Sequence, residues 1–364
     1  PSLCHTPASL PSTEYFGFAD PSGGDSWKSF DWTRITTVAW ASGGDLMCHA
    51  HAHGARVVGG APEFPLTGNA TLRREWVRGL VASVKAMHYD GVVFDLEIPM
   101  DAFTPSSPTL KDFEHYHALM KETRDALHAF IPGSQVSVCV PWGPDGIDGR
   151  VYDFQALAEA SDVLYVMGYD VQSQVLSGRC VAAANSPLPA LQRGIERYLS
   201  LGIPASKMVM GTPWYGYSYP CAKGGVVPGD ECEIPLVPFL GVNCSDAAGV
   251  EVSYGEIMRL FDTNDCAGRF PPPCEVTSGM MWDEASATPF FNFRAGGKPF
   301  QMWLDDAKSS ALKYSMAGSK GLLGVGPYRY DYLDSSGKLA GNPNAPKETK
   351  EMWDALGAFE AARG

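Results

Sequence analysis

The sequence has no apolar run that approaches the roughly 18 residues needed to span a bilayer. It is also poor in basic residues, with 28 Lys and Arg against 41 Asp and Glu and a formal net charge of −13. A chain this acidic lacks the basic surface that phosphate backbones and anionic lipids attract. We therefore expect neither nucleic acid nor a membrane as a partner, and we expect a monomer.

Several motifs of other enzyme classes are missing. No Cys-x-x-Cys occurs, which argues against a zinc ribbon and a thioredoxin-like site, and no Gly-x-Ser-x-Gly marks a serine hydrolase. The glycines of segment 321–326 are not followed by the Lys and Ser/Thr of a phosphate loop. His49, His51 and His53 alternate, but the segment reads as a helix, which puts only His49 and His53 on one face. We therefore predict no metal and no cofactor.

The chain does contain nine cysteines and two N-glycosylation acceptors, Asn69 and Asn243. Both features are typical of proteins that pass through an oxidising secretory compartment. The first residues do not read as a signal peptide. We therefore expect a processed mature form that is lysosomal or secreted.

The cysteine positions suggest disulfides without fixing their connectivity. Cys266 and Cys274 flank a Gly- and Pro-rich run and are the safest predicted pair, whereas Cys4 and Cys48 are a plausible long-range bridge. Cys139 lies in an apolar run and is predicted to be a buried thiol. Three cysteines of one Gly- and Pro-rich stretch can supply another bridge: Cys221, Cys232 and Cys244.

Strand-like apolar runs alternate with helical patterns along the chain. The predicted strands are 14–19, 35–41, 55–61, 91–97, 135–140, 163–169, 208–214 and 321–325. The clearest predicted helices are 71–88, 110–130, 153–160, 188–201 and 347–362. Eight strands with intervening helices predict an α/β fold, a (β/α)8 TIM barrel, which places chemistry at the C-terminal ends of its strands.

The interval between the seventh and eighth predicted strands differs from the rest. It begins with a Gly-, Pro- and Cys-rich stretch, and segments 289–294 and 299–304 flank an Ala-Gly-Gly turn that reads as a hairpin. We predict one catalytic domain, 1–364, with a small α+β insertion at 215–306. That insertion is expected to form part of the wall of the substrate cleft.

The segment Asp90-Gly-Val-Val-Phe-Asp95-Leu-Glu97 sets acidic residues into an apolar run. Residues two apart on a strand point the same way, so Asp95 and Glu97 are predicted to project together. Two close carboxyl groups do not both ionise freely. One pKa is raised, which allows that group to keep its proton and serve as a general acid.

This segment resembles the signature of glycoside hydrolase family 18, the chitinases and their relatives, at Asp90, Gly91, Asp95 and Glu97. The middle Asp of that signature is Val93 here, a position also relaxed in the di-N-acetylchitobiase branch of the family. Stretches spread over nearly the whole chain are similar to that branch: 46–51, 166–174, 180–185, 209–217 and 244–249.

The resemblance implies an exo-acting glycosidase that cleaves the β-1,4 bond between N-acetylglucosamine residues. In this family the substrate's own acetamido carbonyl attacks the anomeric carbon, and the product keeps its configuration. Glu97 would then be the proton donor, Asp95 would orient the acetamido N–H, and the Tyr169 hydroxyl would bind the acetamido oxygen.

Met167 and Asp170, which lie with Tyr169 in segment 166–174, would position the sugar. Aromatic rings near strand ends can stack on sugars but are as readily part of the core: Trp142, Trp214, Tyr215 and Trp303. The family's eighth strand usually ends in a Trp, which segment 324–328 lacks, so either Tyr328 or a neighbour substitutes or sugar binding is weakened. The alternative is a catalytically weak or silent chitooligosaccharide-binding lectin, and the retained Glu97 favours the enzyme.

Overall fold

The computed structural model of the protein describes residues 11–20, 24–99, 110–176, 178–266, 268–333 and 341–363. The chain groups into two compact units, each described by itself. The first, called the barrel unit, comprises Pro1–Met167, Gly194–Gly211 and Lys320–Gly326. The second unit comprises Gly168–Arg193, Thr212–Ser319 and Pro327–Gly364.

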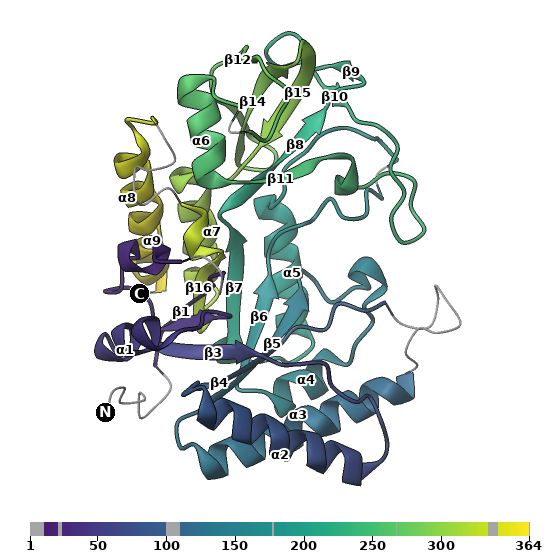
Figure 1. Ribbon diagram of the computed structural model, residues 1–364. Coiled ribbons are helices and arrows are strands. Elements are labelled where there is room, and N and C mark those ends of the chain that lie inside the picture. Colours follow the sequence, from purple (N-terminus) through teal and green to yellow (C-terminus); the bar gives the residue numbers. More distant parts are fainter. Residues whose placement is uncertain are drawn as a thin grey trace. The chain divides into compact units, whose positions relative to one another are not determined.

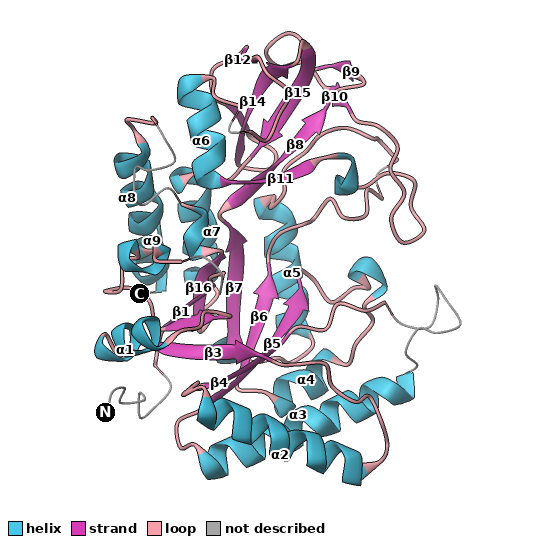
Figure 2. Cartoon of the chain, in the orientation of Figure 1, coloured by secondary structure: helices cyan, strands magenta, loops and turns pink. Residues whose placement is uncertain are grey.

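The barrel is closed by parallel strands in the order β1-β16-β7-β6-β5-β4-β3-β2 (Figures 1 and 2). The strands are β1 (Glu14–Phe18), β2 (Thr37–Ala39), β3 (Arg56–Gly60), β4 (Gly91–Phe94), β5 (Gln135–Pro141), β6 (Val163–Met167), β7 (Met208–Pro213) and β16 (Gly324–Tyr328). The predicted (β/α)8 barrel is confirmed. Each strand departs from its predicted bounds by one to three residues at one end or both. The largest shifts are at β4, which ends at Phe94, and at β16, which begins at Gly324 and ends at Tyr328.

Both faces of the barrel strands are buried, which explains their apolar composition. On β4, the Phe94 ring centroid lies 5.4 Å from that of Phe64, in the loop after β3, and 6.0 Å from that of Tyr116, on a surrounding helix. Because side chains alternate along a strand, Val93 faces the barrel interior. Gly91 precedes it with φ 155°, and a Cβ there would lie 1.9 Å from the Gln135 carbonyl oxygen. Glycine therefore allows β4 and β5 to approach closely.

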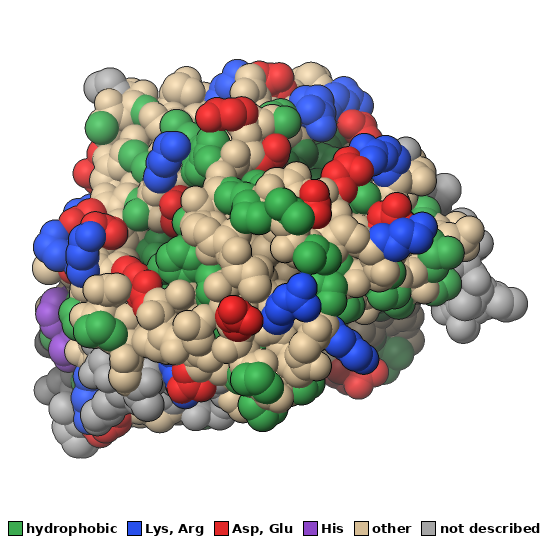
Figure 3. Space-filling model, turned by 90° about the horizontal axis from the view of Figure 1, so that it is seen from above, with side chains coloured by type: hydrophobic (Ala, Val, Ile, Leu, Met, Phe, Trp, Pro, Cys, Tyr) green, Lys and Arg blue, Asp and Glu red, His purple; other side chains and the backbone are tan. Residues whose placement is uncertain are grey.

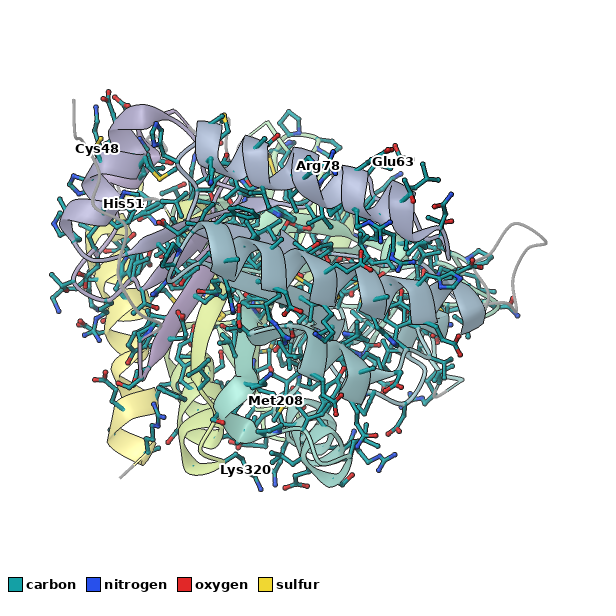
Figure 4. All side chains as sticks on the ribbon, turned by 90° about the horizontal axis from the view of Figure 1, so that it is seen from below. Cys48, His51, Glu63, Arg78, Met208 and Lys320 are labelled. Carbon is teal, nitrogen blue, oxygen red and sulfur yellow. A yellow bond between two sulfur atoms is a disulfide. The ribbon has the colours of Figure 1, made fainter. Side chains whose placement is uncertain are left out.

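Asp90, the first residue of the acidic segment, ties this region together. Its Oδ2 accepts a hydrogen bond from the Val57 backbone N–H (2.8 Å) and lies 2.7 Å from Nε2 of His51. The side chains of Asp90 and His51 are buried at 0% and 2% exposure. Figure 4 shows His51 and Cys48 on the same helix, α1 (Gly44–Ala52). Asp90 therefore joins β3, β4 and α1.

The predicted helices form with small shifts at their ends. The helices that follow the early strands are α2 (Ala70–Ala86), α3 (Leu110–Phe130), α4 (Phe154–Ala160) and α5 (Leu188–Ser200). Asn69 caps α2, because its side-chain oxygen accepts hydrogen bonds from the N–H groups of Thr71 and Leu72. Asn69 and Asn243 are both exposed, and their glycosylation stays a prediction.

The second unit contains an antiparallel sheet in the order β11-β8-β15-β14-β12, with β13 paired to β14, and a separate β9–β10 pair. Its strands are β8 (Tyr215–Pro220), β9 (Lys223–Gly224), β10 (Cys232–Glu233), β11 (Val250–Ser253), β12 (Cys274–Val276), β13 (Met281–Asp283), β14 (Thr288–Ala295) and β15 (Lys298–Trp303). The predicted hairpin is β14 and β15, which pair Phe293 with Phe300.

Helices complete the second unit: α6 (Tyr254–Thr263), α7 (Ala307–Ser319), α8 (Ala345–Ala355) and α9 (Gly357–Arg363). The predicted C-terminal helix 347–362 is thus two helices, α8 and α9. The insertion contains both strands and a helix, α6, so its predicted α+β composition is confirmed. Its contribution to the wall of a substrate cleft stays a prediction.

Three disulfides cross-link the second unit: Cys180–Cys244, Cys221–Cys232 and Cys266–Cys274. The last is the predicted loop bridge. Cys139 is a buried free thiol, as predicted. Within the described residues Cys48 is also free, and Cys4 lies outside them, so the Cys4–Cys48 bridge stays a prediction.

The surface carries charges of both signs. On the face seen in Figure 3, acidic and basic side chains lie next to one another. None of the helices in the described ranges is long and apolar enough to cross a membrane.

A carboxyl pair joins α6 and α8 in the second unit. The side chains of Glu348 and Asp262 share a hydrogen bond, and Asn342 Nδ2 donates to Glu348 Oε2 at 3.1 Å. Partial burial and the charge of Asp262 raise the pKa of Glu348 to about 7. The folded protein therefore holds a proton here that the unfolded chain loses near the ordinary Glu value.

A raised carboxyl pKa stabilises the fold at low pH, and this contribution is lost as pH rises to about 7. Glu348→Gln removes the charge and keeps the hydrogen-bonding shape. We expect the variant to raise Tm by a few degrees at pH 8 and to change it little at pH 4. Thermal unfolding at both pH values tests this, with Glu360→Gln as the control, since Glu360 is an exposed residue of α9. An equal Tm shift at both pH values would contradict it.

Candidate active site

Asp95 and Glu97 leave the C-terminal end of β4, just beyond the strand in which the sequence placed them. Asp95 is partly buried, and its Oδ1 atom has no exposed surface. Burial first, and then the negative charge of Glu97, raise the pKa of Asp95 to about 7. The raised pKa that the sequence predicted for one carboxyl of the pair is thus found at Asp95, and the assignment of Glu97 as proton donor stays a prediction.

Two neighbours act against this rise. Hydrogen bonding from the Cys139 thiol of β5 and the positive charge of Arg150 both lower the pKa of Asp95. Burial also raises the pKa of Cys139 well above its usual range, so Cys139 stays a neutral thiol. Asp95 is therefore poised between a protonated and a charged state.

Arg150 positions Glu97. Its Nη1 donates to Glu97 Oε2 at 2.6 Å and its Nη2 donates to Asp148 Oδ2 at 2.8 Å. The Arg150 side chain is only 6% exposed, whereas that of Glu97 is 51% exposed. A buried arginine thus holds an accessible carboxylate in one place. No pattern in the sequence singled out Arg150, although its place shortly after β5 puts it at the strand-end face of the barrel.

Tyr152 fixes the backbone of the same loop. Its hydroxyl donates to the Ile98 carbonyl oxygen at 2.5 Å and accepts a hydrogen bond from the Ile98 N–H at 3.0 Å. The ring stacks on Phe113 of α3 with centroids 4.5 Å apart. The segment that carries Asp95 and Glu97 is therefore held from one side by α3 and the loop that precedes α4.

Oδ1 of Asp95 and Nε1 of Trp142 are among the buried polar atoms of this region that have no hydrogen-bond partner in the described residues. A buried polar atom without a partner is costly, so such atoms mark places where a ligand can supply the missing bond. Trp142, which follows β5 and is partly buried, remains a candidate for sugar binding.

The other predicted catalytic residues lie in the second unit, directly after β6. Asp170 Oδ1 accepts a hydrogen bond from the Tyr215 hydroxyl at 2.6 Å and a longer one from the Tyr217 hydroxyl at 3.4 Å. The Asp170 N–H donates to Asn185 Oδ1 at 2.8 Å. Asp170 is thus held from both its side chain and its backbone.

Tyr169 belongs to a cluster of tyrosines around Tyr215. The Tyr215 ring lies 5.9 Å from the rings of Tyr169 and Tyr328, and 6.1 Å from that of Tyr332. Tyr328 ends β16, where the sequence showed no Trp, and its ring is 5.6 Å from that of Tyr169. Met167, the last residue of β6, is 8% exposed.

Two of the aromatic candidates are core residues instead. Trp214 is 0% exposed and packs edge-on against Trp353 at 5.0 Å. Trp303 stacks on Phe290 at 4.5 Å, and its Nε1 donates to Gln301 Oε1 at 2.8 Å. Because apolar packing takes up these rings, they do not offer a face to a sugar. The partly buried rings that remain candidates are Trp142 and Tyr328, whereas Tyr215 is 2% exposed and reaches the site through the hydroxyl that holds Asp170.

The described part of the chain holds no group of three His, Cys, Asp or Glu arranged to bind a metal ion. His49 and His53 lie on one face of α1, with rings 4.4 Å apart, and His51 belongs with Asp90.

A parallel barrel with two coupled carboxyl groups at the end of its fourth strand is the architecture of a glycoside hydrolase. Comparison with known proteins gives the family. The model for glycosyl hydrolases family 18 matches residues 56–332, and the chain belongs to this family.

Curated relatives cover most of the chain. The di-N-acetylchitobiase of Rattus norvegicus is 40% identical over 338 residues, which are 92% of this chain and 85% of that protein. The human di-N-acetylchitobiase is 36% identical over 367 residues, 98% of this chain and 86% of that protein. The fold is similar to that of the Ostrinia furnacalis Group IV chitinase in complex with allosamidin, with a TM-score of 0.70, 16% identity, and coverage of 97% of this chain and 100% of that one.

Arg150→Met removes the cation that holds Glu97 and leaves a side chain of similar length. We expect glycosidase kcat to fall about tenfold, because a displaced catalytic group loses its alignment with the reacting bond. Arg197→Met is the matched control, since Arg197 makes an exposed ion pair with Asp145. Steady-state kinetics of both variants, with Tm measured in parallel, test this. Equal activity of the two variants would show that Arg150 does not position Glu97.

Proposed function

We propose that the protein hydrolyses the β-1,4 bond between N-acetylglucosamine residues, in chitobiose, chitooligosaccharides or the N-glycan core. The relatives named di-N-acetylchitobiase support this substrate class. The observation that carries the chemistry is the carboxyl pair, in which Asp95 keeps a proton near neutrality beside the accessible Glu97. We further propose that action is exo.

The pair holds one proton when no substrate is bound, and that proton lies on Asp95. An acetamido N–H that donates to the unpartnered Oδ1 of Asp95 favours the charged carboxylate. The proton then passes to Glu97, which is accessible and held by Arg150. Substrate binding itself thereby creates the general acid.

The bond changes follow from these charges. Glu97 gives its proton to the glycosidic oxygen as the bond from that oxygen to the anomeric carbon breaks. The acetamido carbonyl oxygen forms a new bond to the same carbon, which produces a cyclic oxazolinium cation. The Asp95 carboxylate stabilises this cation. Water then attacks the anomeric carbon, Glu97 takes a proton from it, and the ring opens with retained configuration.

The substrate supplies the nucleophile because the chain offers none on this strand. Val93 is the next residue on the interior face of β4, and Asp90 is buried at the other end against His51. We assign the Tyr169 hydroxyl as the donor to the acetamido oxygen. Asp170, held by Tyr215 and Tyr217, is assigned to the sugar hydroxyls, and Met167, Trp142 and Tyr328 to its apolar faces.

The three disulfides fit an oxidising compartment. We propose that the protein is lysosomal or secreted and acts as a monomer. An acidic compartment suits the carboxyl pair, which keeps its shared proton there.

Glu97→Gln keeps the shape of the acid and removes its proton. We expect kcat on chitobiose to fall at least ~100-fold, the usual scale of general acid catalysis, with little change in Tm because Glu97 is exposed. Glu114→Gln on α3 is a control. Near-normal turnover by this variant would show that Glu97 is not the general acid. Retained oligosaccharide binding by a wild-type protein without turnover would point to the lectin instead.

The acetamido group is predicted to be obligatory. The enzyme should cleave the N-acetylated disaccharide and leave the same linkage in glucose or free-amine form intact. A thiazoline mimic of the cyclic intermediate should bind more tightly than substrate, because it resembles the state that the site stabilises. Asp95→Asn should weaken both turnover and thiazoline binding, as measured by kinetics and calorimetry. A trapped glycosyl-enzyme ester would exclude this mechanism.

The expected pH dependence of kcat/KM follows from the raised pKa of Asp95. Its raised pKa keeps one proton on the pair below about pH 7, and that proton is lost above it. We therefore expect kcat/KM to decline above pH 7, tenfold for each further pH unit. A kcat/KM profile from pH 4 to 9 at constant ionic strength measures this. A rate that keeps increasing up to pH 9 would be incompatible with the shared proton.

A further inference from the structure

Cys139 lies beside Asp95 on the interior of the barrel. In the register of β4 and β5, Phe94 is opposite Val138, and both side chains share one face. Phe94 packs outward against Tyr116, so Asp95 and Cys139, the next residues on each strand, turn to the interior. Cys139 is 3% exposed and forms no disulfide.

Strand β4 offers Asp95 no side-chain donor of its own, because all its residues are apolar and Val93 occupies the interior position two residues earlier. A donor is available from the neighbouring strand, since the register of β4 and β5 places Cys139 beside Asp95 and its thiol lowers the pKa of that carboxyl. Oδ1 of Asp95 has no partner in the described residues and is open to a ligand.

We propose that Cys139 is a positioning residue for the reaction: its thiol holds the Asp95 carboxyl in one orientation and favours the charge that faces the oxazolinium. This inference rests on the proposed function. It assigns to β5 a task that β4, with Val93, cannot perform.

The remaining groups around Asp95 do not duplicate this contact. Glu97 carries a negative charge on the same segment, and Arg150 follows β5 with a positive one. Tyr116 of α3 and Tyr152 before α4 have pKa values raised by burial and stay neutral phenols. Cys139 is therefore the uncharged donor on Asp95, and its removal leaves the charges of the surroundings unchanged.

The test compares Cys139→Ser, which keeps a donor, with Cys139→Ala, which removes it. A thiol that only fills space behaves as a small hydrophobe, so Ala would be tolerated better than Ser. A positioning role predicts the opposite order in kcat/KM, with Ser within about twofold of the wild type and Ala about tenfold lower. Ser161→Ala is the control for loss of a buried donor, since the Ser161 hydroxyl donates to the Leu157 carbonyl oxygen at 2.8 Å, and it should leave kcat/KM unchanged.

The second readout does not need turnover. The carboxyl of Asp95 is titrated by NMR in protein labelled with ¹³C-aspartate, and its signal is assigned by its absence in Asp95→Asn. Loss of the donor should move the midpoint upward by about half a pH unit in Cys139→Ala and leave it near the wild-type value in Cys139→Ser. The decline of kcat/KM at high pH should move by the same amount.

The outcomes separate the two proposals. A wild-type enzyme without turnover on N-acetylated substrates would overturn the proposed function, while the NMR midpoints still decide the role of Cys139. Midpoints that are equal in the wild type and Cys139→Ala would overturn the inference and leave the glycosidase assignment intact. If Cys139→Ser does not fold, the Cys139→Ala midpoint alone decides.

Discussion

The partial burial of the Asp95 carboxyl beside Glu97 is the interaction on which the proposed chemistry depends. In water both groups would ionise and neither could donate a proton near neutrality. At the end of β4, burial and mutual repulsion keep one proton on the pair. The surrounding groups shift the pKa of Asp95 in opposite directions. The Cys139 thiol and Arg150 favour the charged carboxylate, whereas burial favours the protonated form.

The barrel supplies the rigidity that this balance requires. Parallel strands buried on both faces fix the backbone up to Phe94, and Tyr152 then holds the next turn through Ile98. Arg150 anchors Glu97 from the loop that follows β5. A carboxyl pair on a mobile loop would not keep a constant separation, and its coupling would average toward the values of free side chains.

In the second unit, hydrogen bonds from neighbouring side chains fix Asp170 in a similar way. Two tyrosine hydroxyls and an asparagine side chain satisfy this residue, and the rings of the same tyrosines pack with Tyr328. Residues that a sugar would meet are thus held by one another. The same unit uses Trp214 and Trp303 for its core, which shows that a tryptophan near a strand end need not belong to a binding site.

The sequence by itself determined the barrel, the hairpin at 288–303, the Cys266–Cys274 bridge and the acidic segment at the end of the fourth strand. These features depend on local periodicity, turn residues and short spacing, which a linear pattern contains. Only the tertiary structure decided that burial raises the pKa of Asp95, that Arg150 contacts Glu97 while Cys139 lies beside Asp95, and that two tryptophans are buried. Desolvation and contacts between distant segments set these properties, and neither can be read from the order of residues.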